Sequence, residues 1–514
     1  KGSTKKYVLI VRSFRDKAGK PRQETLWNLG PVNDSNEAVT VALAKRLIAN
    51  LEGQPIILDG ADIQETMRQN WGAPAVMEQL WNRFSMSQAI PHASKADAIK
   101  LMMTDRLINP CSKLSTYQNR HQYQGLKEVD INQLYRSLDY LADNADGIKK
   151  HIYQKQRLRS TCDVVFFDVT TLYFESQKAD LLRDFGYSKD CKFNEVQIVL
   201  CLLVDSSGKP LSYELFPGNT FEGSTLIPAL KRLHEQFEVN KLVIVADRGM
   251  GSKANLEAIK EAGYDYIVGA KLRCASKALQ AEAIVEEGYS SLYSGEQADQ
   301  RKYKVLKKGA EDWIVFYSSK RAHKDQADRA RLVEKARELL QHKSFKDKRG
   351  AKKFINYPQD KGIAAPLGLD DEKIEYERKF DGYYAISFSD KNLSAEKIAN
   401  AYHGLWMIEE NFRTLKSFFE IRPIFHWTKR RIEGHILLNF LLLVMENHLL
   451  EACQHTAQSH ITHNIVRQAI DAMQVSTLNV DNACFASYAP IEQTQNIILQ
   501  AMHIPKPKNH NIQL

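Results

Sequence analysis

Three acidic residues, Asp168, Asp247 and Glu409, stand where a metal-binding carboxylate would be useful. Asp168 follows the apolar run 164–167 and Asp247 follows the apolar run 242–246, so each is expected at the end of a strand. Open α/β sheets bind ligands at the carboxyl ends of their strands, where carboxylates of neighbouring strands can share a metal ion. Phosphodiester chemistry uses two Mg²⁺ ions held by such oxygen ligands. The pattern therefore predicts a two-metal phosphodiester site.

The third carboxylate is expected on a helix. Five residues at alternating steps of three and four share one helix face: Tyr402, Leu405, Glu409, Phe412 and Lys416. Leu405 and Phe412 would press this face onto the sheet, where an ionised Glu409 is costly unless a metal ion offsets its charge. Pairing with Arg413 is the structural alternative for Glu409. Taken singly, each strand-end aspartate is more often a turn former or a helix cap than a metal ligand.

The elements that must position these residues lie mainly between 161 and 270. The pattern predicts five strands, which end at or run through Asp168, 196–204, 210–216, 241–246 and 264–268. The first three form an antiparallel meander, and helices from Ser224 and Ser252 separate the last strands. A strand at 382–388, a long helix from Ser394 to about 420 and a helix at 430–451 return to the same pattern. We therefore expect an α/β fold with a mixed sheet flanked by helices.

The N-terminal part reads differently. Residues 7–14 and 23–30 predict a β-hairpin, and a helix is expected at 36–51. Residues 60–160 are mostly helical by periodicity, with breaks at 72–74, 91 and 109–110. These helices fit either a helix-turn-helix module or a plain bundle. Four basic residues near the breaks favour DNA contact: Arg106, Lys113, Arg120 and Lys127.

Residues 271–380 interrupt the core pattern with short strand-like runs and a basic helical stretch. That stretch, 320–353, carries 13 Lys and Arg against 5 Asp and Glu. Charge runs are usually solvated helix faces, and phosphate contact is the second interpretation. After 451 the tail is expected to be helical and then irregular.

Composition narrows the class of protein. The 514 residues exceed one core and predict two to four domains. A net charge of +9 is compatible with a nucleic-acid partner. Seven scattered cysteines without a Cys-x-x-Cys pair indicate reduced thiols in a cytoplasmic protein. The apolar stretch 436–445 is too short to cross a bilayer and contains Asn439, so we expect a buried helix and no membrane contact. No phosphate-loop or dinucleotide motif predicts a nucleotide cofactor.

Taken together, these motifs resemble the DDE transposases of bacterial insertion sequences. The group carries the signature Tyr-x2-Arg-x3-Glu-x6-Lys, which this chain matches at Tyr402, Glu409 and Lys416 and departs from at Leu405, where the group has Arg. Arg413 or Arg422 is a candidate replacement. Residues 167–171 and 245–250 resemble the first and second acidic motifs, and 422–436 resembles the tail after the third.

The resemblance implies an RNase H-like core in which Asp168, Asp247 and Glu409 hold two Mg²⁺ or Mn²⁺ ions. It implies that water cleaves each transposon end and that the freed 3′-hydroxyl attacks target DNA. The protein would work as a homodimer in a synaptic complex on double-stranded DNA, in the bacterial cytoplasm. Six residues are expected to contact DNA: Tyr402, Lys416, Arg413, Arg248, Arg422 and Arg431. Trp406 and Trp427 could stack on a flipped base, although core packing is the expectation for each.

These expectations combine into a domain plan. It comprises a β-hairpin and helix at 1–60, a helical DNA-binding region at 61–160, the first part of the core at 161–270, a β-rich, basic insertion domain at 271–380, the second part of the core at 381–450 and a helical region at 451–514. Other functions remain open. A nuclease or integrase on the same fold would cleave without transposition, a catalytically retired transposase would only bind DNA, and a basic chromatin protein would bind with steep salt dependence.

Overall fold

The computed structural model describes residues 6–16, 19–32, 45, 63–157, 164–176, 178–186, 194–237, 242–292, 301–308, 311–341, 350–356, 368–480, 483–508 and 510–512. The chain divides into two compact units. The first comprises residues 1–68, 475–489 and 507–514, and the second comprises 69–474 and 490–506. The helix predicted at 36–51 lies outside the described residues.

The first unit contains the predicted hairpin. β1 (Lys6–Arg15) pairs with β2 (Pro21–Val32) in antiparallel register. The amide of Gly19 donates to the Asp16 carbonyl oxygen at 2.8 Å, and Gly19 has a φ of +77°, a conformation that glycine adopts without steric cost. The turn therefore forms where the sequence predicts it.

A four-stranded sheet in the order β17-β16-β15-β3 was not expected. Its strands are β3 (Ile63–Asn70), β15 (Gln474–Val480), β16 (Ala483–Tyr488) and β17 (His510–Ile512). The prediction of helix from 60 and of a helical, then irregular tail is therefore wrong at these segments. Val475, Leu478 and Val480 belong to a short apolar and polar pattern with several β-branched residues, which favours a strand over a helix.

The second unit begins with a layer of helices. Its members are α2 (Gly72–Arg83), α3 (Met86–Ala89), α4 (Ala93–Ile108), α5 (Lys113–Asn119), α6 (Ile131–Asp143) and α7 (Ala145–Arg157). The predicted breaks at 91 and 109–110 separate α3 from α4 and α4 from α5. Gly72, Ala73 and Pro74 form the first turn of α2 instead of a loop, which suits a proline because early helix positions have no intrahelical amide bond to lose.

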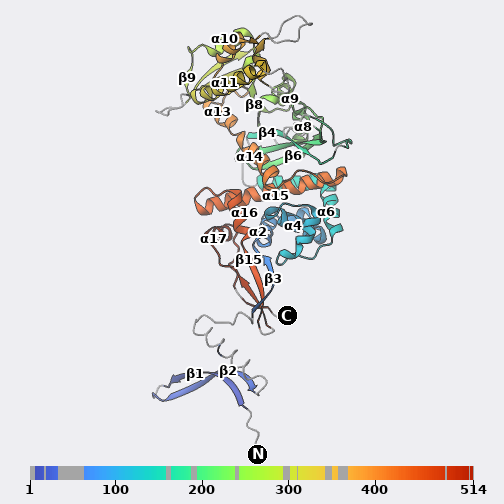
Figure 1. Ribbon diagram of the computed structural model, residues 1–514, viewed down its shortest axis with the longest axis vertical. Helices are drawn as coiled ribbons and strands as arrows, with labels where there is room; N and C mark the ends of the chain where they lie inside the picture. Colours follow the sequence, from blue (N-terminus) through green and yellow to red (C-terminus); the bar gives the residue numbers. More distant parts are fainter. Residues whose placement is uncertain are drawn as a thin grey trace, which may run out of the picture. The chain divides into compact units, whose positions relative to one another are not determined.

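A nine-stranded mixed sheet forms the centre of this unit, in the order β6-β5-β4-β7-β8-β14-β11-β10-β9 (Figure 1). Its first five strands are β4 (Val164–Tyr173), β5 (Gln197–Asp205), β6 (Pro210–Pro217), β7 (Val243–Ala246) and β8 (Asp265–Ala270). β4, β5 and β6 form the predicted antiparallel meander, while β7 runs parallel to β4 and β8 runs parallel to β7. Helices α8 (Leu226–Phe237) and α9 (Lys253–Glu261) separate the parallel strands in the chain.

The sheet continues into residues 271–380. β14 (Tyr383–Phe388) pairs antiparallel with both β8 and β11 (Glu311–Ser318), and β11 pairs with β10 (Arg301–Lys308), which pairs with β9 (Ser290–Ser291). α10 (Lys277–Ile284), α11 (Ser319–Gln341), α12 (Asp371–Arg378) and a short β12–β13 pair (Ile355–Asn356 and Gly368–Leu369) complete this part. On the basic helix α11, Arg321, Arg331 and Arg337 each pair with an acid three or four residues away, which favours the solvated-face interpretation for these side chains.

The helix predicted from Ser394 to 420 forms in three pieces. α13 (Ala395–His403) begins at the Ser394 cap, α14 (Trp406–Arg413) follows, and residues Thr414–Phe418 form a π-helix. The break falls at Gly404, where an added Cβ would lie 2.5 Å from Cζ of Phe166. The helix backbone thus touches the sheet at this point, and the even periodicity assumed for one helix does not hold.

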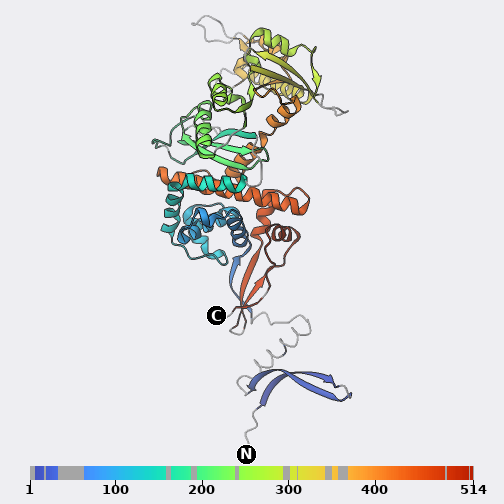
Figure 2. The same cartoon turned by 180° about the vertical axis from the view of Figure 1, so that it is seen from behind.

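One long helix joins the helical layer to the sheet. α15 (Lys429–Ala457) contacts both α6 and β6, and both views show it running between them (Figures 1 and 2). An added Cβ at Gly434 would lie 2.0 Å from the Leu138 carbonyl oxygen, so α6 and α15 cross at that glycine. α15 is apolar and long enough to span a membrane, but 72% of its most apolar window is buried inside the protein. The predicted buried helix is confirmed. α16 (His463–Asp471) and α17 (Gln493–Ala501) follow.

Candidate active site

Asp168 and Asp247 lie side by side on the sheet. The parallel register of β4 and β7 ends with the pair Phe167 and Ala246, and each aspartate is the next residue in the chain, Asp168 within β4 and Asp247 just after β7. Neighbouring strands are about 4.8 Å apart, so the two backbones remain close at this position. Two adjacent carboxylates repel each other, and a divalent cation between them would offset that repulsion.

The first predicted strand runs through Asp168 and does not end there. β4 continues to Tyr173 and stays paired with β5 to the register pair Tyr173 and Gln197, because the following residues include the β-formers Val169, Thr170 and Thr171. What ends at Asp168 is the pairing with β7. Asp247 does follow its strand directly, as expected.

Both aspartates face away from the main apolar core of the sheet. Phe167 and Ala246 belong to that core, and side chains alternate between faces along a strand, so Asp168 and the still extended Asp247 point to the other side. Each carboxylate accepts a hydrogen bond from the next backbone amide, from Val169 at 2.8 Å and from Arg248 at 2.6 Å. These bonds orient the two carboxylates.

Helices α13 and α14 cover the carboxylate face. α13 contacts β7 and β8, and α14 contacts β4 and β5. The Asn411 side chain fixes α14, since it donates to the Gly208 carbonyl oxygen at 2.9 Å and accepts from the Asn447 side-chain amide at 3.0 Å. Sequence reasoning did not single out Asn411, because it follows Glu409 and Glu410 and carries no distinct signal in the sequence.

Glu409 lies on α14 but its side chain is exposed. Glu409 was expected on the buried face of this helix, and that expectation is wrong: Ile408, Asn411 and Phe412 form the buried face of α14, and Glu409 lies beside it. Arg413, the alternative partner, pairs with Glu410 instead. Among the residues that the structure describes, Glu409 forms no ion pair, and no three His, Cys, Asp or Glu side chains are grouped so that they could hold a metal ion.

Tyr402 reaches the carboxylates from α13. An added Cβ at Gly269 of β8 would lie 2.5 Å from the Tyr402 hydroxyl, so glycine makes room for the ring at this position. Burial raises the pKa of Tyr402 to about 12, with a further contribution from the negative charge of Asp247 and opposition from Arg321 and Arg248. The hydroxyl is therefore protonated at neutral pH and is available as a hydrogen-bond donor.

The other residues expected to contact DNA are dispersed. Arg248 is exposed beside Asp247, Arg413 is exposed and paired with Glu410, and Lys416 is half-buried in the π-helix. The guanidinium of Arg422 lies 5.3 Å from the centre of the Tyr173 ring at the end of β4. Arg431 lies on α15, 5.0 Å from the Tyr135 ring and 3.5 Å from the Asp139 carboxylate.

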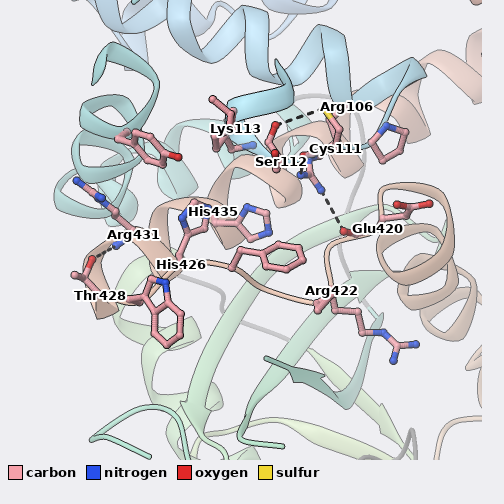
Figure 3. Close-up of a pocket in the computed structure, with 16 residues that line it drawn as sticks. Arg106, Cys111, Ser112, Lys113, Glu420, Arg422, His426, Thr428, Arg431 and His435 are labelled. Atoms are coloured by element: carbon pink, nitrogen blue, oxygen red, sulfur yellow. Dashed lines mark hydrogen bonds between the residues drawn. The ribbon is translucent and has the colours of Figure 1, made fainter. Parts of the chain in front are cut away.

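Arg422 and Arg431 both line a second feature, a cavity of about 380 Å³ between the helical layer and the segment 420–435 (Figure 3). Arg106 and Lys113 line it from α4 and α5, and His435 lines it from α15. The sequence pointed to these basic residues one at a time and expected surface contacts with DNA. It did not predict that Arg106 and Lys113 are buried, or that they belong to one cavity.

The two tryptophans are not core residues. Trp406 is 58% exposed and Trp427 is 63% exposed, so the expectation of core packing is wrong for both. The guanidinium of Arg183 lies 5.5 Å from the centre of the Trp427 ring, which lines the cavity. Arg183 lies near the Trp427 ring, and much of the ring remains exposed to solvent.

Comparison with known proteins gives two family matches. Residues 160–445, more than half of the chain, match the family described as the transposase DDE domain. Residues 1–56 match the N-terminal domain of the IS1634 family of transposases. No curated protein matches the chain. Among solved structures, a cryo-EM structure of the piggyBac transposase synaptic complex with hairpin DNA is similar at a TM-score of 0.39 and 7% identity, covering 78% of this chain and 76% of that one.

Proposed function

The chain belongs to the DDE transposases of insertion sequences, and we propose that it cleaves the ends of its transposon and joins their 3′ ends to target DNA with divalent metal ions. The observation that carries this proposal is the juxtaposition of Asp168 and Asp247 on neighbouring parallel strands. The strand order β6-β5-β4-β7-β8, an antiparallel meander followed by two parallel strands, supports an RNase H-like core.

The donor set suits Mg²⁺, with Mn²⁺ as a substitute. Mg²⁺ in proteins is commonly held by one or two carboxylates together with water and substrate phosphates, and Asp168 and Asp247 supply such a pair. We propose Glu409 as the third carboxylate, because it lies on the helix that packs against β4 and β5 and is exposed. Two bound cations would supply charge stabilisation at the attacking and leaving oxygens of the phosphodiester.

The protein's own residues would position the DNA. Tyr402, held neutral beside Asp247, would donate a hydrogen bond to a phosphate oxygen near the scissile bond. Arg248 is exposed next to the same carboxylate, and Lys416, Arg413, Arg422 and Arg431 are proposed to contact the backbone further along. Cleavage of two ends requires two active sites, so we include a homodimer in a synaptic complex and a bacterial cytoplasmic location in the proposal.

The test is cleavage of transposon-end DNA by single-residue variants. Asp168→Asn and Asp247→Asn should each lower the cleavage rate by about 10³-fold or more, because loss of a metal ligand removes several kcal/mol of transition-state stabilisation. Binding of end DNA, measured by gel shift, should persist. Glu257→Gln on α9, an exposed acid outside the site, is the control. Wild-type cleavage by either aspartate variant would overturn the proposal.

Adjacent acids on one helix test the third position. Glu409→Gln should lose cleavage to a similar degree, whereas Glu410→Gln, which removes only an ion pair with Arg413, should retain it. Equal loss in both variants would mean that α14 is disturbed and that Glu409 has no special role. Supplying pre-cleaved ends with a free 3′-hydroxyl then separates transposase from nuclease, since only a transposase joins them to target DNA.

A further inference from the structure

The cavity between α4, α5 and the segment 420–435 is lined by a buried lysine that has no acidic partner among the described residues. Lys113 is 4% exposed and its Nζ has no hydrogen-bond partner among the described residues. Burial, with repulsion from Arg106, lowers the pKa of Lys113 well below its ordinary value. In its charged form the amine can only donate hydrogen bonds, so it needs acceptor oxygens. The protein leaves this need unmet at the edge of an open space.

A second cation lies in the same wall. Arg106 is 5% exposed and donates to three backbone carbonyl oxygens, those of Phe419 at 2.7 Å, Glu420 at 3.3 Å and Cys111 at 2.7 Å. Neither Arg106 nor Lys113 forms an ion pair with an acid in the part of the chain that the structure describes. These carbonyls hold the guanidinium in place without neutralising it.

The nearby acids are already engaged or exposed. Asp105 accepts from the Tyr123 hydroxyl at 2.7 Å and from the Cys111 thiol at 2.9 Å. Burial, together with this contact to Asp105, raises the pKa of Cys111 to about 11, which keeps the thiol uncharged. Glu420 lines the cavity, but its side chain is exposed. Asp105 offsets part of the positive charge of Arg106 and Lys113 and leaves the cavity without a bound anion.

The volume of the cavity and the aromatic rings at its edge indicate which class of ligand it could bind. Figure 3 shows Lys113 and Arg106 entering from the helical layer while the guanidinium of Arg422 is directed away from them. A volume of about 380 Å³ is in the range of small-ligand sites. Phe425 and Trp427, at 60% and 63% exposure, stand at the cavity as open aromatic surfaces, and bases stack on such surfaces without sequence preference.

We propose that this cavity is a phosphate-binding site that holds a phosphate group of a DNA strand on Lys113 and Arg106. The inference rests on the proposed function only for its choice of DNA as the source of the phosphate. The site is separate from the carboxylate pair. Ile424 bridges to Phe174 at the end of β4, and Phe174 is six residues from Asp168, about 20 Å along an extended strand.

The test measures binding in EDTA, so that it does not depend on metal ions or on cleavage. The probes are inorganic phosphate, a ten-nucleotide thymidine strand with a 5′-phosphate and the same strand with a 5′-hydroxyl. The intrinsic tryptophan fluorescence, to which Trp427 contributes, and a thermal shift report binding. The wild type should bind the phosphorylated strand at least about tenfold more tightly than Lys113→Met does, which is the effect of losing one charged hydrogen bond.

Two further variants make the result decisive. Lys150→Met removes an exposed lysine on α7 and should bind like the wild type. Arg431→Gln leaves Lys113 in place and should weaken binding by a smaller factor, which keeps the test informative if Lys113→Met does not fold. Unchanged binding by both Lys113→Met and Arg431→Gln would overturn the site. Lys113-dependent binding of inorganic phosphate without binding of either strand would overturn DNA as the source. Loss of cleavage in the aspartate variants has no bearing on these outcomes.

Discussion

Two lysines in the second unit are equally buried, and their surroundings differ. Lys149 on α7 lies 3.3 Å from the Glu214 carboxylate of β6 and 3.6 Å from Asp146. Arg232 pairs with the other oxygen of Glu214. Lys113 on α5 has no such acid among the described residues, and repulsion from the guanidinium of Arg106 adds to the effect of burial on its pKa, which is lowered. The fold gives Lys149 a buried acidic partner, and no described acid pairs with Lys113.

Lys149 and Lys113 thus differ in role: one connects two elements of the fold, and the other is available to bind a ligand. A buried charge with a buried partner connects two elements, here α7 and the sheet, and breaking it leaves the partner uncompensated. A buried charge without a partner costs free energy in the free protein, and natural sequences keep such a cost mainly at functional sites. The sign of the stability change on removing each lysine therefore distinguishes the two roles.

The largest expected effect is at Lys149. Lys149→Met should lower the free energy of unfolding by about 3 kcal/mol, because Glu214 stays buried and loses its buried partner. Urea unfolding followed by circular dichroism measures this. The neighbouring Lys150→Met, on the exposed side of α7, should change stability by less than about 0.5 kcal/mol. A loss of similar size in both would show that the helix, and not the ion pair, is sensitive.

At Lys113 the expected change has the opposite sign. Lys113→Met should raise the free energy of unfolding by about 1–2 kcal/mol in phosphate-free buffer, because it removes a buried group with no partner. The pKa of Lys113 is lowered in the fold, so the unfolded chain binds its proton more tightly. Stability of the wild type should thus fall as pH drops below 10.5, and the variant should lack this component. A destabilised Lys113→Met protein would contradict the comparison.

The pH dependence of stability should show whether burial and the basic residues of the cavity keep His426 neutral. Burial, together with Lys113, Arg106 and Arg431, lowers the pKa of His426 to about 3 from 6.5. Protons then bind the unfolded chain more tightly, so wild-type stability should decline as pH falls from 6.5 toward 3. Unfolding midpoints of wild type and His426→Asn, measured at pH 7 and pH 5, should differ in slope, with the variant less sensitive. Parallel slopes would mean that the cavity does not hold this ring neutral.

The smallest effect is expected at Arg232, the outer partner of Glu214. Its side chain is 53% exposed, so Arg232→Gln should cost about 1 kcal/mol or less. Thermal unfolding at low and high salt measures the change, which should shrink as salt screens the exposed charge. A cost as large as that of Lys149→Met would show that Arg232, and not the buried lysine, balances Glu214.

Much of the sheet could be predicted because its strands carry continuous apolar runs. The meander β4-β5-β6 and the strands β7, β8 and β14 lie where these runs are. β3 was missed because its partner β15 lies about 400 residues later in the chain, and the adjacent strands β15 and β16 were missed because their patterns are short. The helix break at Gly404 was missed for a related reason. It depends on the approach of Phe166, some 240 residues earlier in the chain, which periodicity within the helix cannot reveal.

Some features of the candidate site could likewise be predicted from the sequence, and others could not. The sequence placed Asp168 and Asp247 each directly after an apolar run. Because the two runs form neighbouring parallel strands, the two aspartates lie side by side. The exposure of Glu409 depends on which residues of α14 pack on the sheet, and these are Ile408, Asn411 and Phe412. The phosphate cavity draws on α4, α5 and residues 420–435, so each basic side chain appeared in the sequence as an ordinary surface charge. Burial, which only tertiary structure decides, is what makes Lys113 distinctive.

The close crossing at Gly434 fixes which residues of α15 face α6. Only a residue without a Cβ fits against the Leu138 carbonyl, so a slip of one position would drive Glu433 or His435 into α6. The same register aims His435 into the phosphate cavity and sets Phe440 5.0 Å from the Tyr213 ring on β6. The contact at Gly434 therefore fixes the position of α15 along its axis, and with it the positions of His435 in the cavity and of Phe440 on the sheet.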